Sequence, residues 1–100
     1  MRIIVLWNSC RGISAAEDAS WVESETEKLR AVDGVADVRV RQVESAALSH
    51  PRAWDWYLEL ELGNGDAPSA VVRRPEVAEF LADLRMLGTR PTVLALPGAT

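Results

Sequence analysis

Large apolar and mostly charged residues alternate along Trp54–Leu62. Side chains of a strand point in turn to its two faces, so this period of two predicts a strand with one apolar and one polar face. The apolar set is Trp54, Trp56, Leu58, Leu60 and Leu62, and the other set is Asp55, Tyr57, Glu59 and Glu61. A helix would scatter both sets around its circumference, so we assign a strand here.

Three further segments have the composition of strands. Ile3–Trp7 is a continuous apolar run of strand length, as expected of a buried strand. In Val35–Val43, β-branched residues alternate with charged ones, and Thr92–Leu96 lies between two prolines. The chain therefore contains four predicted strands, with a long connection, Glu44–Ala53, before Trp54–Leu62.

A first helix is predicted between the first two strands. Ser14 followed by Glu17 forms a capping box, in which the serine hydroxyl accepts from the amide three residues on. The helix should continue to about Val32 and end at Asp33-Gly34, since glycine readily adopts the left-handed conformation found after helices. Its predicted buried stripe, at helical spacing, is Ala15, Ala19, Val22, Thr26, Leu29 and Val32.

A second helical region follows the third strand. It should start near Pro68, because proline is favoured in the first turn of a helix, and Pro75 should interrupt it. The main helix is then Glu76–Leu87, ended by Gly88. Its predicted inner stripe is Val77, Phe80, Leu81, Leu84 and Leu87.

The order of elements is β-α-β-β-α-β, which predicts an α+β, ferredoxin-like fold in one domain covering residues 1–100. Right-handed crossovers place both helices on one face of a four-stranded antiparallel sheet. The other face stays uncovered and invites a second subunit. On that face we expect Arg39 and Arg41 to lie opposite Glu59 and Glu61.

Composition narrows the classes of function. The 100 residues are 48% hydrophobic and 26% charged, with a net charge of −4. A negative chain repels phosphates, and the polar strand face carries carboxylates rather than base-stacking aromatics, so we expect no nucleic-acid partner. We expect no membrane association, because the N-terminal apolar run is too short for a signal peptide or a span. The single cysteine, Cys10, is consistent with a reducing, cytoplasmic location.

Three segments resemble the dimeric α/β-barrel superfamily, which includes the stress-responsive A/B barrel and EthD-like groups. They are Arg2–Trp7, Asp55–Leu62 with the acidic glycine turn after it, and Arg74–Leu81, which is similar to an H-P-x-H-x-x-F motif at the start of the second helix. The likeness covers nearly the whole chain in layout. It implies a homodimer formed sheet to sheet. The members of the superfamily include cofactor-independent cyclases and monooxygenases, haem-degrading enzymes and proteins without known activity.

Two departures from the family pattern limit what the resemblance implies. Cyclase-like members use a histidine of that motif as acid or base, and the corresponding places here hold Arg74 and Val77. Haem-degrading members combine a first-strand asparagine with a helix histidine that ligates iron. Asn8 follows the first strand here, but no helix contains a histidine, so we expect no haem degradation. The resemblance to cofactor-independent members implies that no other cofactor is used.

Two residues are candidates for acid–base chemistry. His50 is the only histidine and lies in the long connection before Pro51, where it is either a general acid or base at a pocket mouth or an exposed loop residue. Tyr57, flanked by Asp55 and Glu59, either donates a proton to a developing enolate or belongs to an outward or dimer-forming face. A lone histidine and a distant cysteine make a poor metal site, so we expect none.

Candidate binding residues cluster around the first and third strands. Trp7, Trp54 and Trp56 either form the wall of a hydrophobic pocket between sheet and helices or simply fill the core. The turn that starts at Asn8 can hold an anionic group through exposed amides and Arg11, or it is an ordinary turn.

The sequence thus favours a small homodimeric protein that binds a hydrophobic aromatic molecule. As an enzyme it would act without a cofactor, by proton transfer for cyclisation or by oxygenation of a substrate carbanion. In the alternative, it is a non-catalytic ligand-binding or stress-related dimer. The predicted catalytic residues are His50 and Tyr57, and the predicted binding residues are Trp7, Asn8, Arg11, Trp54 and Trp56.

Overall fold

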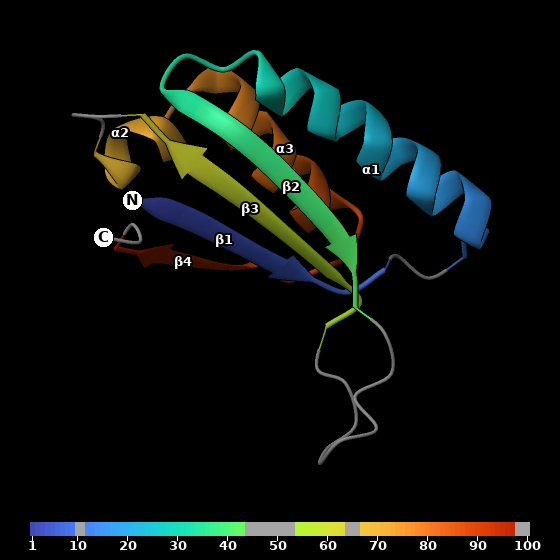
Figure 1. Cartoon of the computed structure of the whole chain (residues 1–100). Coiled ribbons are helices and arrows are strands. Elements are labelled where there is room, and N and C mark those ends of the chain that lie inside the picture. The colour runs from blue at the N-terminus through green and yellow to red at the C-terminus, as the bar shows by residue number, and fades with distance from the viewer. Residues whose placement is uncertain (10–11, 44–53, 64–66, 98–100) are drawn as a thin grey trace.

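The computed structural model of the chain describes residues 1–9, 12–43, 54–63 and 67–97. Its strands and helices follow the predicted order (Figure 1). They are β1 (Arg2–Trp7), α1 (Ala15–Arg30), β2 (Val35–Gln42), β3 (Trp56–Leu62), α2 (Pro68–Val72), α3 (Pro75–Met86) and β4 (Thr92–Leu96).

The four strands form one antiparallel sheet in the order β2-β3-β1-β4. Strands that follow one another through a helix are therefore separated by a third strand, which is the split βαβ arrangement expected from the sequence. The ferredoxin-like α+β fold is confirmed.

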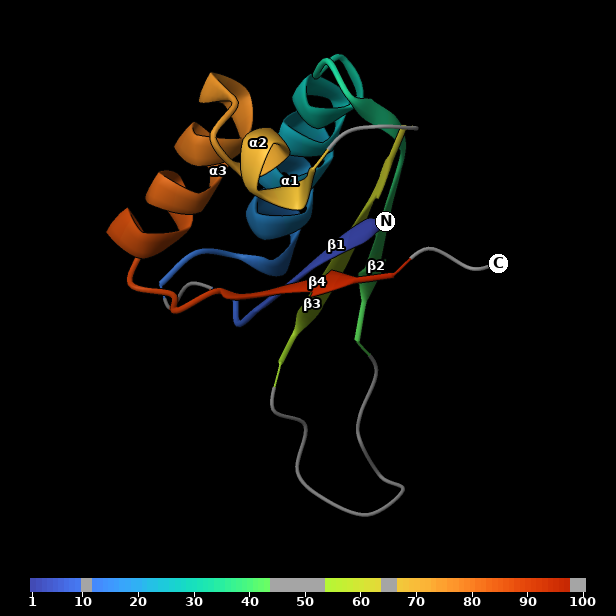
Figure 2. The ribbon, with the colours of Figure 1, turned by 90° about the vertical axis from the view of Figure 1, so that its left-hand side faces the viewer.

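The helices all lie on one side of the sheet, as the view turned by 90° from Figure 1 shows (Figure 2). Alternate residues of each strand point towards them, so Ile3, Val5 and Trp7 of β1 join the core together with the apolar set of β3. Buried residues from both layers make one hydrophobic cluster. Its largest fully buried members are Trp7, Phe80, Ile3, Leu29, Leu58, Leu60 and Leu84.

The predicted ends of both long helices are found. The Ser14 hydroxyl accepts from the amide of Glu17 at 3.1 Å, which caps α1. Pro75 occupies the first turn of α3, so it separates α3 from the short α2. Gly34 and Gly88 follow the two helices with φ of 90° and 84°, in the left-handed region that the predicted stops required.

The predicted inner stripe of α1 was wrong near its start. Val22, Thr26 and Leu29 are buried as expected, but Ala15 and Ala19 are exposed. Asp18 and Glu25 are buried instead. Asp18 turns inward because it accepts hydrogen bonds from the end of the sheet, an attraction that apolar periodicity does not record.

Two other boundaries differ by small amounts. Trp54 is half-buried and precedes β3, which begins at Trp56. Leu87 is 40% exposed rather than on the inner stripe, because α3 ends at Met86 and the chain then turns towards β4. The tryptophan–leucine face of β3 lies beneath the helices, as predicted.

The register on the uncovered face matches the expected charge pairing only in part. Arg39 lies opposite Glu59, as expected. Arg41 lies opposite Tyr57, and Glu61 lies opposite Asp37, so the second expected pair was wrong. An irregularity in β2 between Val35 and Asp37 shifts the register there.

Candidate functional site

An aromatic stack fills the space between the sheet and the helices. Trp7 and Trp56 lie opposite each other on neighbouring strands, and their rings stack with centroids 6.2 Å apart. Phe80 of α3 meets Trp7 edge-on at 5.5 Å and stacks on Trp21 of α1 at 5.9 Å. Trp7 is 1% and Trp56 6% exposed, so these rings are core residues. The role predicted for them, a pocket wall, would require this stack to open.

A buried polar network lies at the end of this stack. The Trp56 indole Nε1–H donates to Asp18 Oδ2 at 2.8 Å and to Ser9 Oγ at 3.2 Å. The Ser9 hydroxyl in turn donates to Asp18 Oδ2 at 2.8 Å, and its amide donates to Asp55 Oδ2 at 2.8 Å. Asp18 is only 7% exposed, so these donors offset the cost of burying its carboxylate. The network joins α1, β3 and the turn that follows β1.

A depression of about 710 Å³ opens beside this network, where β1 ends and the α3–β4 turn passes by. We call it the strand-end depression. One wall carries the polar side chains that follow β1 and precede β3, and the other is the α3–β4 turn. Its lining residues are Asn8, Ser9, Asp55, Leu87, Gly88, Thr89 and Arg90.

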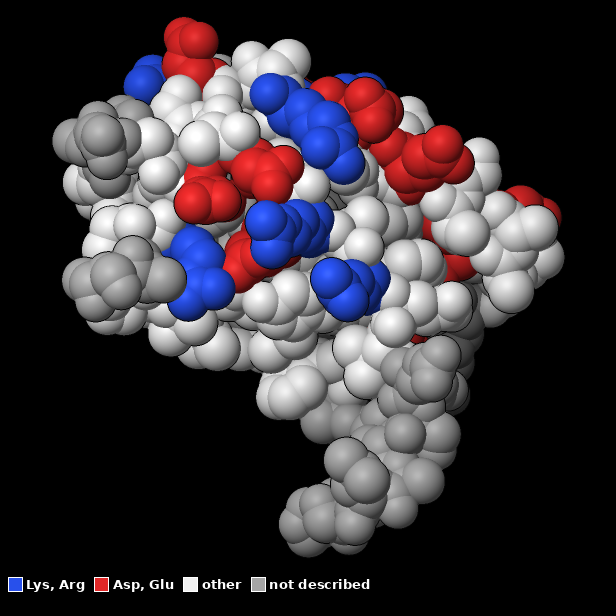
Figure 3. Space-filling view, in the orientation of Figure 1, with Lys and Arg blue, Asp and Glu red and all other residues white. Residues whose placement is uncertain are grey.

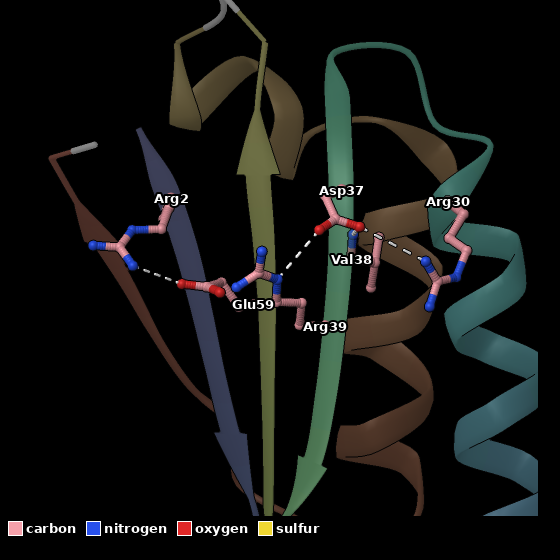
Figure 4. Close-up of polar contacts among 6 residues, drawn as sticks. All are labelled: Arg2, Arg30, Asp37, Val38, Arg39 and Glu59. Carbon is pink, nitrogen blue, oxygen red and sulfur yellow. Dashed lines mark hydrogen bonds and ion pairs between the residues drawn. The ribbon is translucent and has the colours of Figure 1, made fainter. Parts of the chain in front are cut away.

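The uncovered sheet face carries interleaved acidic and basic side chains (Figure 3). Arg2 Nη1 donates to Glu59 Oε1 at 2.9 Å across neighbouring strands, and Glu59 is 8% exposed. Arg39 Nε pairs with Asp37 Oδ2 at 3.2 Å within β2 (Figure 4). Arg41 makes no ion pair with any described residue.

These side chains border a second depression, of about 500 Å³, which we call the sheet-face depression. Three arginines, one tyrosine and one glutamate line it, and the acidic Asp37 and Glu61 lie on the same face of the sheet. Its lining residues are Arg2, Arg39, Arg41, Gln42, Val43, Tyr57 and Glu59.

A third, smaller depression of about 370 Å³ lies between the β4 edge and α2, and we call it the edge groove. It lies between sheet and helix, where the sequence predicted an apolar pocket, but tryptophans do not line it. Its lining residues are Ile3, Pro68, Ser69, Val72, Arg73, Val93, Leu94 and Ala95.

The structure separates the predicted site residues. Tyr57 lies on the uncovered face, whereas Trp7 and Trp56 point to the helices, so the phenol and this aromatic pair do not face one space. Asn8 lines the strand-end depression. Trp54 is half-buried and directly precedes Asp55, which lines the same depression. His50 and Arg11 lie outside the described residues, and their roles stay predictions.

Sequence reasoning missed three polar residues of these sites: Ser9, Asp18 and Arg41. In the sequence, nothing distinguishes Asp18 from the other charged residues of the first helix. A signal was present only for Arg41, whose alternation with Arg39 in β2 places both on the polar face.

The places that correspond to the acid–base histidine of the resembled family hold Arg74 and Val77, neither of which is suited to proton transfer near neutral pH. Val77 is 1% exposed and belongs to the core cluster, and Arg74 lies exposed before α3. A mechanism like that of the cyclases therefore cannot use this position.

The described part of the chain has no group of three or more His, Cys, Asp and Glu side chains arranged to hold a metal ion. Nor does any helix in it combine the length and apolarity needed to cross a bilayer.

No family model and no curated protein matches the chain in sequence. Solved structures do match its fold. A protein from Arabidopsis thaliana superposes with a TM-score of 0.73 at 14% identity, covering 99% of this chain and 96% of that one. A dimeric ferredoxin-like protein of unknown function from Thermobifida fusca gives 0.65 at 17% identity, covering 95% and 89%.

A variant of SnoaB from Streptomyces nogalater, described as a cofactor-independent oxygenase, gives a TM-score of 0.62 at 12% identity, covering 98% of this chain and 94% of that one. Other matches are described as DABB and EthD family proteins. The chain thus has the ferredoxin-like fold of the superfamily that its sequence resembles.

Proposed function

We propose that the protein is a homodimer, formed through the uncovered sheet face, that binds a small aromatic molecule and acts on it without a cofactor. The observation that carries this proposal is the sheet-face depression, where Arg41 and Tyr57 lie side by side on neighbouring strands. It places the Arg41 side chain beside a phenol that can donate a hydrogen bond, and the described structure leaves it open to one side.

A second sheet would close this site. Next to the charged half of the face lies an apolar half: Leu94 and Leu96 of β4 are 44% and 40% exposed, and Ile4 lies between Leu94 and Glu59 across the strands. Apolar surface that remains exposed beside a polar region is typical of an interface. The fold comparison supports the same arrangement, since the Thermobifida fusca protein is described as dimeric.

Enclosure would also strengthen the chemistry. An enolate formed on the substrate would place its negative oxygen near the Arg41 guanidinium, and the Tyr57 hydroxyl would donate a hydrogen bond to it. Excluding water behind a second sheet lowers the local dielectric and makes both interactions stronger. His50 stays the predicted base that removes the carbon-bound proton.

Turnover of anthrone by the purified protein tests the proposal. Anthrone forms an aromatic enolate, and its reaction with O2 gives anthraquinone and water. The formation of anthraquinone is followed by absorbance, with no cofactor added. We expect Tyr57→Phe and Arg41→Gln each to lower kcat/KM by about 100-fold, a usual contribution for a positioned proton donor or charge. Arg73→Gln, which removes a charge far from Tyr57, is the control.

Two results would contradict the assignment. Activity that survives in both Tyr57→Phe and His50→Ala would exclude the predicted catalytic residues. Native mass spectrometry that shows only a monomer at micromolar concentration would exclude the closed site.

A second candidate function rests on the edge groove. It is mainly apolar and, besides Arg73 and Ser69, offers no polar side chain, so it is suited to binding without catalysis. Substituting Val72→Glu would abolish binding of an apolar probe there while leaving anthrone turnover unchanged, which separates the two functions.

A further inference from the structure

We infer that Glu59 is a specificity-determining residue of the sheet-face depression, where it accepts a hydrogen bond from a hydroxyl group of the substrate. The substrate class is then an aromatic ketone with a hydroxyl at the opposite end of its ring. The inference rests on the proposed function, because Glu59 lines the same depression as Tyr57 and Arg41. Those two residues meet the ketone oxygen, and Glu59 meets the other end of the ring.

One oxygen of the Glu59 carboxylate is fixed, and the other is unengaged. Arg2 Nη1 donates to Oε1 at 2.9 Å, and Figure 4 shows both side chains on the uncovered face of the sheet. No described residue donates to Oε2. Oε2 is also not fully enclosed, since the one fully buried side-chain atom without a partner in the described part of the chain is Arg2 Nε. A ligand in the depression can therefore reach Oε2.

The burial of Glu59 makes a partner for Oε2 favourable. The residue is 8% exposed, and Arg39 lies directly opposite it on β2. Few water molecules can reach this oxygen, although an ionised carboxylate has several acceptor sites. A hydrogen bond to a charged acceptor is stronger than one between neutral groups. A substrate hydroxyl is therefore favoured here over an apolar or ether group, which would leave the carboxylate oxygen without a donor.

Tyr57 presents the complementary group at the right distance. Its hydroxyl makes no hydrogen bond with a described residue, so it can donate to a ketone oxygen. Tyr57 and Glu59 are two residues apart on β3, so their side chains share a face and their Cα atoms are about 7 Å apart. Two oxygens at opposite ends of one benzene ring have a similar separation. The donor and the acceptor thus match a ring with a ketone at one end and a hydroxyl at the other.

Binding of three small probes tests the role of Glu59 without turnover. They are 4-hydroxyacetophenone, 4-methoxyacetophenone, whose ether cannot donate, and 4-ethylphenol, which has no ketone. Titrations at about pH 6, where the phenols keep their protons, are followed by amide chemical shifts. We expect 4-hydroxyacetophenone to bind with a Kd of about 1 mM and to shift the amides of Tyr57 and Glu59. The other two probes should bind about tenfold more weakly.

Matched variants separate the two ends of the ligand. Glu59→Gln should reduce the preference for the hydroxyl over the methoxy probe to about twofold, because an amide oxygen is an uncharged and weaker acceptor. Glu61→Gln should keep the preference, since Glu61 is exposed on the same face of β3 but does not line the depression. Tyr57→Phe should weaken both ketone probes alike and also keep the preference, because it removes only the donor to the ketone oxygen.

Three results would overturn the inference: equal binding of the hydroxyl and methoxy probes, a preference that survives in Glu59→Gln, or a preference lost equally in Glu61→Gln. Anthrone turnover is a separate readout, because anthrone has no ring hydroxyl. Turnover without the preference would reject the role of Glu59 and leave the proposed function standing. The preference without turnover would support the role of Glu59 and contradict the proposed reaction.

Discussion

The two faces of this sheet are made by the same four strands, yet they differ in almost every physical respect. The helix-covered face is a continuous apolar layer closed by the Trp7–Trp56–Phe80 stack. The uncovered face is divided into an apolar half, on β4 and at Ile4 of β1, and a charged half, on β2, β3 and at Arg2 of β1. The covered face holds the fold together, whereas the uncovered face is available for a partner and for chemistry.

The two faces also differ in whether their buried polar atoms have hydrogen-bond partners. On the covered side, Asp18 is buried with both of its donors in place. On the uncovered side, the buried Nε of Arg2 has no acceptor within the described part of the chain. Buried polar atoms are normally satisfied, so the exception lies on the face that we propose is completed by a second protomer.

The largest expected effect separates the two faces directly. Phe80→Ala should lower the free energy of unfolding by about 3–5 kcal/mol, because it leaves a cavity between two tryptophans. Leu94→Ala, on the uncovered face and 44% exposed, should cost less than about 1 kcal/mol at a protein concentration where the chain is monomeric. Urea unfolding followed by circular dichroism measures both. Similar losses would mean that the faces contribute equally to stability.

The next effect concerns the buried network at the end of the covered face. Asp18→Ala should cost about 1–3 kcal/mol, because the Trp56 indole loses its shorter hydrogen bond and Ser9 its acceptor. Glu17→Ala, one residue away but exposed, is the control, since its capping contact is made by the main chain. A shift in the fluorescence of the folded Asp18→Ala protein would report the change around Trp56. Equal stability of the two variants would show that the network is dispensable.

An intermediate effect is expected on association. Leu94→Glu should raise the dimer dissociation constant at least about tenfold, or about 1.4 kcal/mol, because a charge would enter the apolar half of the interface. Met86→Glu, at an 85% exposed position of α3 on the helix side, should leave it unchanged. Sedimentation velocity over a range of concentrations would measure both. A dimer equally sensitive to both substitutions would place the interface elsewhere.

The smallest effect is expected from the surface charges. Glu59→Gln should cost no more than about 1 kcal/mol, because its partner Arg2 is 38% exposed and solvent weakens the pair. The difference from the unsubstituted protein should shrink at about 1 M salt, where screening acts over roughly 3 Å. Glu27→Gln, in the more exposed pair with Arg30, should have no measurable effect. If dimers are as stable at high as at low salt, charge does not contribute to association.

The sequence by itself determined the elements and the fold. The alternation in β3 and the helical spacing of Val77, Phe80, Leu81 and Leu84 follow from the two backbone periods, which depend only on neighbours in the chain. Glycines and prolines marked where helices begin and end, because their backbone preferences are local. The order of elements then left the ferredoxin-like topology as the simplest arrangement.

Tertiary structure alone decided how side chains from distant segments meet. The Ser9–Asp18–Trp56 network joins residues up to 47 positions apart, and no local period records such a contact. The half-confirmed charge pairing shows the same limit, because the register at which β2 meets β3 sets which arginine faces which carboxylate. The position of a site depends on such non-local registers, whereas the fold depends mainly on patterns that each segment carries within itself.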